Sequence, residues 1–196
     1  PDFSKERFVR FAKTVYGHYP GIHGINWIDP EGMFKWIFST KNNSELIEKN
    51  INQLDTGVRN AFEKAQKTLQ YIISPCYEAL PGEICFSEFW PLVYNGKIQG
   101  YLNGVFQVQE IMDICLGKKI EKNFCIQIYE DRQLIFMNEK HHKHENESLY
   151  NRFRSIQTIT FPGKTWQMYV EPRSSVFESR DITNRSFLFF AITISL

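Results

Sequence analysis

The chain has almost no excess of charge of either sign, since 23 lysine and arginine residues face 22 aspartate and glutamate residues, for a formal net charge of +1. These charges are dispersed, with no basic stripe and no acidic or low-complexity tail. A surface for nucleic acid is therefore not indicated. The sequence also lacks Gly-x-Ser-x-Gly, His-Glu-x-x-His and the phosphate-binding Gly-x-x-x-x-Gly-Lys-Ser/Thr. We expect no catalytic residue and no cofactor.

Cysteine is also scarce. The four residues are Cys76, Cys85, Cys115 and Cys125, and no Cys-x-x-Cys pair occurs, which argues against a zinc knuckle. The turn residues between Cys76 and Cys85 allow two strands to place these thiols side by side. We favour buried thiols, and one or more disulfides are the alternative that spacing leaves open. The charged segment around His141–His144 is interpreted as a solvated loop, so no metal site is expected.

Apolar and aromatic residues are plentiful, at 42% and 15% of 196 residues, which is ample for a core. Helical spacing of Phe8, Phe11 and Val15 predicts a helix over residues 2–16, with Ser4 as its N-cap. Two strands follow at 22–28 and 33–39, and Asp29-Pro30-Glu31-Gly32 between them is typical of a tight turn.

Helix formers then predict one helical segment from Ser44 to Leu54 and a second over 56–69. Three strand-like stretches follow at 70–77, 83–93 and 97–107, of which the last two are joined by an Asn-Gly turn. A short helix over 109–116 ends at Gly117. This order resembles a PAS-like sensor module, which implies a five-stranded antiparallel sheet with helices covering one face.

A smaller unit begins near Asn123. Strands are expected at 124–129, 134–137, 155–161 and 165–171, the last two around the turn Pro162-Gly163-Lys164. The fold class expected is therefore α+β: tandem PAS-like modules with antiparallel sheets, preceded by an N-terminal helix.

The sequence ends in an apolar run, residues 187–196, that follows a polar stretch. Its ten residues are about half of the roughly 20 that cross a bilayer. We interpret the run as the start of a membrane helix, and a fifth strand of the smaller module is the alternative.

The chain resembles the extracytoplasmic CHASE-type sensor domains of prokaryotic membrane receptors. The resemblance rests on an ordered set of segments: residues 19–32 (YPGIHGINWIDPEG), 86–92 (FSEFWPL), 96–106 (GKIQGYLNGVF) and 162–172 (PGKTWQMYVEP). It implies a tandem PAS-like ectodomain between two membrane helices, ahead of a histidine kinase or diguanylate cyclase. It implies no particular ligand, because this family binds varied small molecules.

The expected organisation has four parts: a stalk helix (1–18), a membrane-distal module (19–117), a smaller membrane-proximal module (118–183) and the start of the second transmembrane helix (184–196). The function expected is extracytoplasmic sensing of an unknown small molecule by a two-pass receptor, homodimeric in the membrane through the stalk helix. The alternative is a protein-interaction or structural ectodomain without a small-molecule pocket.

An apolar, aromatic lining with a few polar anchors is typical of a ligand pocket. The larger module offers both kinds of side chain on its predicted strands and helix, although a plain aromatic core would use the same residues. The candidate ligand-binding residues are Trp27, Trp36, Arg59, Tyr71, Ser74, Phe86, Glu88, Trp90 and Asn103.

Overall fold

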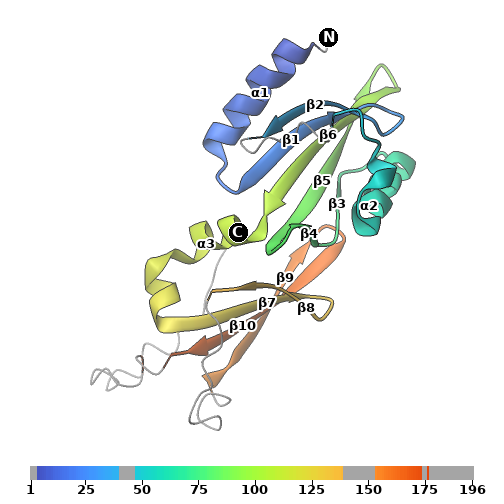
Figure 1. The fold of residues 1–196 in the computed structure, drawn as a ribbon. Helices are drawn as coiled ribbons and strands as arrows, with labels where there is room; N and C mark the ends of the chain where they lie inside the picture. Colours follow the sequence, from blue (N-terminus) through green and yellow to red (C-terminus); the bar gives the residue numbers. More distant parts are fainter. Residues whose placement is uncertain (1–3, 40–46, 139–152, 174–175, 177–196) are drawn as a thin grey trace.

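The computed structural model describes residues 4–39, 47–138, 153–173 and 176. Within them the chain forms two antiparallel sheets, and a bent helix connects the last strand of the first sheet to the first strand of the second (Figure 1). The predicted α+β class, with an N-terminal helix followed by antiparallel sheets, is confirmed. The predicted transmembrane start at 184–196 and the His141–His144 loop lie outside the described residues.

The first sheet has six strands. They are β1 (Ile22–Ile28), β2 (Phe34–Ser39), β3 (Ile72–Ile73), β4 (Tyr77–Leu80), β5 (Glu83–Tyr94) and β6 (Lys97–Gln107). Their order is β2-β1-β6-β5-β3, and β4 also pairs with β5. The predicted strands 22–28 and 97–107 are confirmed to the residue. Their ends can be predicted because turn-forming residues, such as Asn95-Gly96, stand next to them in the sequence.

Helices cover both faces of this sheet, so the prediction of helices on one face is wrong (Figure 1). Helix α1 (Lys5–His18), capped by Ser4, buries Phe8 and Ala12 against Ile25 and Trp27. Helix α2 (Thr56–Thr68) lies on the opposite face and buries Val58, Ala61, Phe62 and Ala65, the face that the sequence predicts. The Asp55 carboxylate caps α2 by accepting hydrogen bonds from the amides of Gly57 and Val58.

The second sheet has four strands in the order β8-β7-β10-β9. They are β7 (Phe124–Glu130), β8 (Gln133–Met137), β9 (Ser155–Phe161) and β10 (Lys164–Pro172). Helix α3 (Val108–Asn123) leads into β7 and is bent at Gly117, whose φ of 64° and ψ of 152° are not helical. The predicted boundary between residues 117 and 118 therefore falls at a kink inside one helix.

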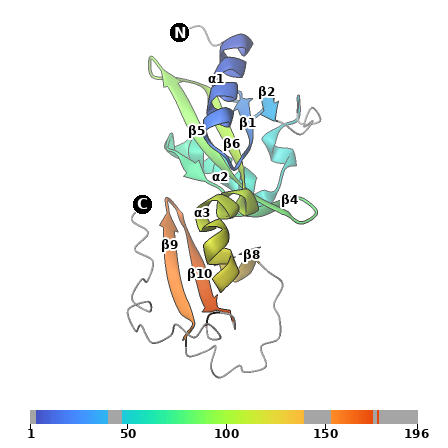
Figure 2. The same cartoon turned by 90° about the vertical axis from the view of Figure 1, so that its left-hand side faces the viewer.

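One hydrophobic core joins the two sheets. Phe86 of β5 and Cys76, which lies between β3 and β4, pack with Ile128 and Trp166 from the second sheet, and Met112 of α3 completes the cluster. In Figure 2, α3 runs beside the second sheet and its first turns lie below the first sheet. The two sheets are consequently one packed body within the described residues.

Two predicted elements differ from the structure. Between residues 47 and 54 the only helix is a 3-10 turn, η2 (Ile51–Gln53), so a continuous helix up to Leu54 is wrong. The Asn50 side chain accepts a hydrogen bond from the Asn52 amide and is the N-cap of this turn, so the turn begins only after Asn50. The predicted strand 70–77 is split into β3 and β4, with Pro75, which lacks an amide hydrogen, between them.

All four cysteines are free thiols, and three of them are buried, as favoured from the sequence. Tyr77, and not Cys76, pairs with Cys85, and Cys76 lies just before β4, so the two cysteines are not partners across the strands. Burial raises the pKa of the Cys76 thiol to about 12, which keeps it protonated and unreactive at neutral pH. No group of metal-ligating side chains and no helix long and apolar enough to cross a membrane occurs within the described ranges.

Candidate functional site

The nine candidate residues lie on two different faces of the first sheet. Directly paired residues of antiparallel strands share a face. One row across the sheet runs Trp36, Trp27, Leu102 and Trp90, on the face that α1 partly covers. The adjacent row runs Ile37, Asn26, Asn103, Phe89 and Ile72, on the face toward α2. The candidates therefore cannot line one pocket together.

On the α1 face, three of the aromatic candidates pack in the core. The ring centroids of Trp27 and Trp36 are 5.3 Å apart, and Phe8 of α1 lies 5.7 Å from Trp36. Phe86 stacks on Phe106 at 5.2 Å, with an interplanar angle of 11°. These contacts account for the burial of Trp27 and Phe86 without a ligand.

The remaining candidates on this face form a partly exposed cluster of Tyr71, Glu88 and Trp90. The Tyr71 and Trp90 ring centroids are 4.1 Å apart, and the Trp90 indole donates to the Glu88 carboxylate at 3.4 Å. Burial, followed by a hydrogen bond to Glu88, raises the pKa of Tyr71. Trp90 keeps 47% of its surface exposed, so this cluster is an open surface and not a cavity.

On the α2 face, buried and partly buried polar side chains form two neighbouring hydrogen-bonded groups near the centre of the sheet. We call Asn26, Ser74, Tyr77, Ser87 and Asn103 the polar layer. The Asn26 amide donates to the Asn103 side-chain oxygen at 2.8 Å, and Asn103 in turn donates to the Glu88 carbonyl at 3.0 Å. Only 3% and 2% of these two asparagines is exposed. Asparagines are rarely so buried, and here both side chains are hydrogen-bonded.

Hydroxyl groups extend the polar layer toward β3 and β4. The Ser74 hydroxyl accepts a hydrogen bond from the Ser87 amide at 2.9 Å, and the hydroxyls of Ser87 and Tyr77 lie 2.9 Å apart. Burial raises the pKa of Tyr77 to about 12, so its hydroxyl remains a neutral donor. The layer thus combines amide donors, amide acceptors and hydroxyls, the groups that bind polar parts of a small molecule.

The N-terminal end of α2 lies beside the polar layer. A Cβ built on Gly57 would lie 3.4 Å from the Pro75 ring. Pro75 and Cys76 are the two residues between Ser74 and Tyr77. Arg59, in the first turns of α2, is half-buried and has no ion-pair partner among the described residues. The N-terminus of α2 already has the Asp55 carboxylate as its cap, so the unpaired Arg59 guanidinium is the group in these turns that favours a negative ligand group. His23 Nε2 and Glu83 Oε2 are 4.0 Å apart, and Glu83 lies two residues from Cys85, the partner of Tyr77 across the strands.

Sequence reasoning named Arg59, Ser74 and Asn103 on this face, and it missed Asn26, Tyr77 and Ser87. The sequence does carry a signal for Asn26, because this amide stands between the apolar residues Ile25 and Trp27. Ser87 carries a similar signal between Phe86 and Glu88 only after the register of β5 is known.

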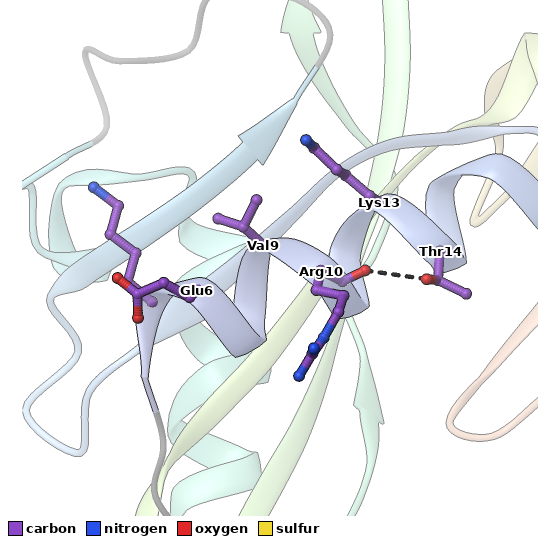
Figure 3. A pocket seen from close by; sticks show the side chains of 6 residues that line it. Glu6, Val9, Arg10, Lys13 and Thr14 are labelled. Atoms are coloured by element: carbon purple, nitrogen blue, oxygen red, sulfur yellow. Dashed lines mark hydrogen bonds between the residues drawn. The ribbon is translucent and has the colours of Figure 1, made fainter.

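Two hollows lie away from this face. One is a shallow depression on the outer side of α1, where Glu6, Arg10 and Lys13 extend away from the helix (Figure 3). The Thr14 hydroxyl donates to the Arg10 carbonyl at 3.1 Å, a hydrogen bond within α1 itself. These solvated side chains on a single helix face provide no enclosure for a ligand. The second hollow lies on the second sheet.

No protein-family model matches the chain, and no curated protein matches it. Solved structures do. An extracellular ligand-binding receptor from Desulfohalobium retbaense aligns with a TM-score of 0.63 and 13% identity over 84% of this chain, which spans 33% of that receptor's length.

Two further structures match over most of their length. The ligand-binding domain of the Pseudomonas aeruginosa amino acid chemoreceptor PctC, in complex with GABA, gives a TM-score of 0.56 and 12% identity over 88% of this chain and 83% of its own. The extracellular domain of vpHK1S-Z8, described as a histidine kinase, gives a TM-score of 0.57 and 13% identity over 94% of this chain and 78% of its own. At such identities the likeness establishes the fold: these neighbours are extracellular sensor and ligand-binding domains with the same arrangement of sheets.

Proposed function

We propose that this chain is the extracytoplasmic ligand-sensing domain of a membrane signalling receptor, and that its ligand binds between the first sheet and α2. The observation that carries the site is the polar layer. Four of its five side chains are buried and Tyr77 is partly buried. Burying polar side chains together costs stability unless each finds partners, so a protein that needs only a core would place apolar residues there. The fold shared with sensor domains supports the general function.

The chemistry of the site favours a small molecule with a carboxylate and an amino group. The Arg59 guanidinium suits the carboxylate, through charge-assisted hydrogen bonds. The side-chain oxygens of Asn103 and Ser87 suit the amine. Phe89 and Tyr101, both buried on the same face, suit an apolar portion. The neighbouring PctC domain, which holds GABA, is an example of this ligand class in the same fold.

The remaining parts of the proposal concern the receptor. Residues 19–117 are its membrane-distal module and 118–183 its membrane-proximal module, with α1 rising from a first membrane helix and a second one starting at 184–196. The output is a histidine kinase or diguanylate cyclase, and the sensor is of the CHASE type. The receptor is a homodimer with α1 in the interface, and Phe11, which stays largely exposed on α1, supports this arrangement.

A protein-docking function is the second candidate. It is favoured by the open cluster of Tyr71 and Trp90, since exposed aromatic side chains are enriched at protein interfaces. Under this alternative, the polar layer would be structural and no small molecule would stabilise the domain.

A thermal-shift screen with the twenty amino acids and GABA tests the proposal. A ligand at about 100 times its Kd adds roughly 2.7 kcal/mol, or about 5–11 °C in Tm for a domain of this size. We expect at least one compound to give such a shift in the wild type and in the control Arg10→Ala, whose guanidinium lies on the outer side of α1. Arg59→Ala should lose most of it.

Two outcomes count against the proposal. If no compound raises the Tm, the domain does not sense this ligand class. If a compound stabilises Arg59→Ala as much as the wild type, its site is not beside α2.

A further inference from the structure

We infer that the second sheet carries a separate site for a small dicarboxylate, on the face that points away from α3. The side chains of β10 alternate, with Trp166, Met168 and Val170 in the core and Thr165, Gln167 and Tyr169 on the outer face. Together with Tyr129 of β7, these outer residues form the floor of the second hollow. No described helix covers this floor, because α3 lies against the core side.

The floor is ordered by its own contacts. Gln167 pairs directly with Tyr129 across the strands, and the rings of Tyr129 and Tyr169 meet edge to face at 5.3 Å. The Tyr169 hydroxyl donates to the Gln167 side-chain oxygen at 3.1 Å, which fixes the orientation of that amide. The Gln167 nitrogen is thereby left as a donor, with no partner among the described residues. A preorganised donor of this kind suits an oxygen-rich ligand.

Arg154 stands at one end of the floor and is held in place. Its guanidinium lies 4.7 Å from the centre of the Tyr169 ring, and its Nε donates to the Glu171 carboxylate at 3.0 Å. Stacking and one ion pair use one face and one nitrogen of the guanidinium. Its terminal nitrogens remain available for a bidentate contact with a carboxylate.

Arg132 stands at the other end, in the two-residue turn between β7 and β8. Both turn residues have positive φ, 45° at Asp131 and 75° at Arg132. This conformation favours glycine or asparagine, and for arginine it is strained. Strain kept at a specific residue points to a role for its side chain. Among the described residues, Arg132 has no ion-pair partner.

Two arginines at the ends and an amide donor between them define the ligand class. Tyr129 pairs with Gln167, Asp131 follows Tyr129 by two residues, and Tyr169 lies two residues beyond Gln167 in the opposite direction. The two ends are therefore about 13 Å apart along the backbone, a distance that two long arginine side chains reduce. A four- or five-carbon dicarboxylate then places one carboxylate at each guanidinium. The lining itself holds two arginines and one acidic residue, Asp131, and Glu171, which pairs with Arg154, lies outside it.

Succinate is the probe, and Arg132→Gly is the informative variant. Glycine relieves the positive φ and removes the guanidinium, so this variant should unfold at a higher temperature than the wild type and bind succinate at least about tenfold more weakly. The control variant Arg59→Ala, on α2, should bind succinate as the wild type does. Isothermal titration calorimetry measures the affinities and calorimetric melting the stabilities.

The inference is overturned if the wild type shows no saturable binding at succinate concentrations up to about 10 mM, ten times the Kd of ~1 mM that is typical of a weak ligand. It is also overturned if Arg132→Gly binds succinate as tightly as the wild type. If Arg59→Ala abolishes succinate binding, the ligand occupies the polar layer and not the second sheet. Arg59→Ala should lose the stabilisation by an amino acid but keep the binding of succinate. The proposed function and this inference can therefore fail independently of each other.

Discussion

The ion pair of Lys164 and Glu130 is the residue-scale feature that joins the two sheets. Their side chains are 8% and 7% exposed, and Lys164 Nζ lies 3.1 Å from Glu130 Oε1. Lys164 also donates to the Ser74 carbonyl at 3.1 Å, and Glu130 accepts hydrogen bonds from the Cys76 amide and the Trp166 indole. Both charges from the second sheet are thus satisfied partly by the first.

The effects of removing the two members of this pair should not add. We expect Lys164→Met or Glu130→Gln alone to lower the free energy of unfolding by about 3–5 kcal/mol, because each leaves a buried group without its partner. The double variant should lose clearly less than the sum of the two. Urea unfolding of the wild type and the three variants gives this double-mutant cycle, and strictly additive losses would show that the two charges do not interact.

The sequence identifies polar residues of the candidate site only where they are unusual for their segment. Asn103 and Ser74 can be named in advance because each is a polar residue directly after an apolar one, Leu102 and Ile73. The face on which they lie cannot, since it depends on register: Trp27 neighbours Asn26 in sequence, yet Trp27 packs on α1 and Asn26 lies under α2. A shift of one residue would exchange these two roles.

At the scale of elements, the close approach of β1 and β6 depends on Gly100. Its φ is 142°, and a Cβ there would lie 2.5 Å from the Ile28 carbonyl oxygen and 3.0 Å from the Trp27 ring. Only glycine allows this contact, because a backbone atom of the central strand cannot move aside cheaply.

Gly100→Ala should therefore destabilise the domain by more than about 1 kcal/mol. Gly17→Ala is the matched control: Gly17 lies in α1 with open space around it, so alanine should stabilise the helix by about 0.5–1 kcal/mol. Chemical denaturation of both variants measures the two changes. Equal effects of the same sign would contradict the assigned role of Gly100.

Elements that combine apolar periodicity with clear end signals are predictable here. Helix α2 has both, since Asp55 caps it and Val58, Ala61 and Phe62 repeat at helical spacing. The stretch before it shows similar spacing at Ile47, Ile51 and Leu54, but Asn50 interrupts it and Glu48 has a positive φ of 68°. Side chains that form hydrogen bonds with the neighbouring backbone compete with the helix there. Apolar periodicity alone does not reveal this competition.

At the scale of the whole molecule, the two sheets share one core, and this is the property that the sequence predicts least. Tandem modules follow from the repeated strand and turn pattern. The packing of Phe86 against Trp166, with ring centroids 5.9 Å apart, joins residues separated by 80 positions, and no local pattern encodes it. A ligand that shifts α2 against the first sheet would act on a body whose second sheet is attached through this core.

The central claim, that a small amino-acid-type ligand binds between the first sheet and α2, is tested most directly by a two-dimensional amide NMR titration with the compound that raises Tm. The account predicts that the largest shifts occur at the backbone amide of Ser87 and the side-chain amides of Asn26 and Asn103, with smaller ones in the first turn of α2. Shifts confined to the open cluster of Tyr71, Glu88 and Trp90, with the polar layer unchanged, would contradict it.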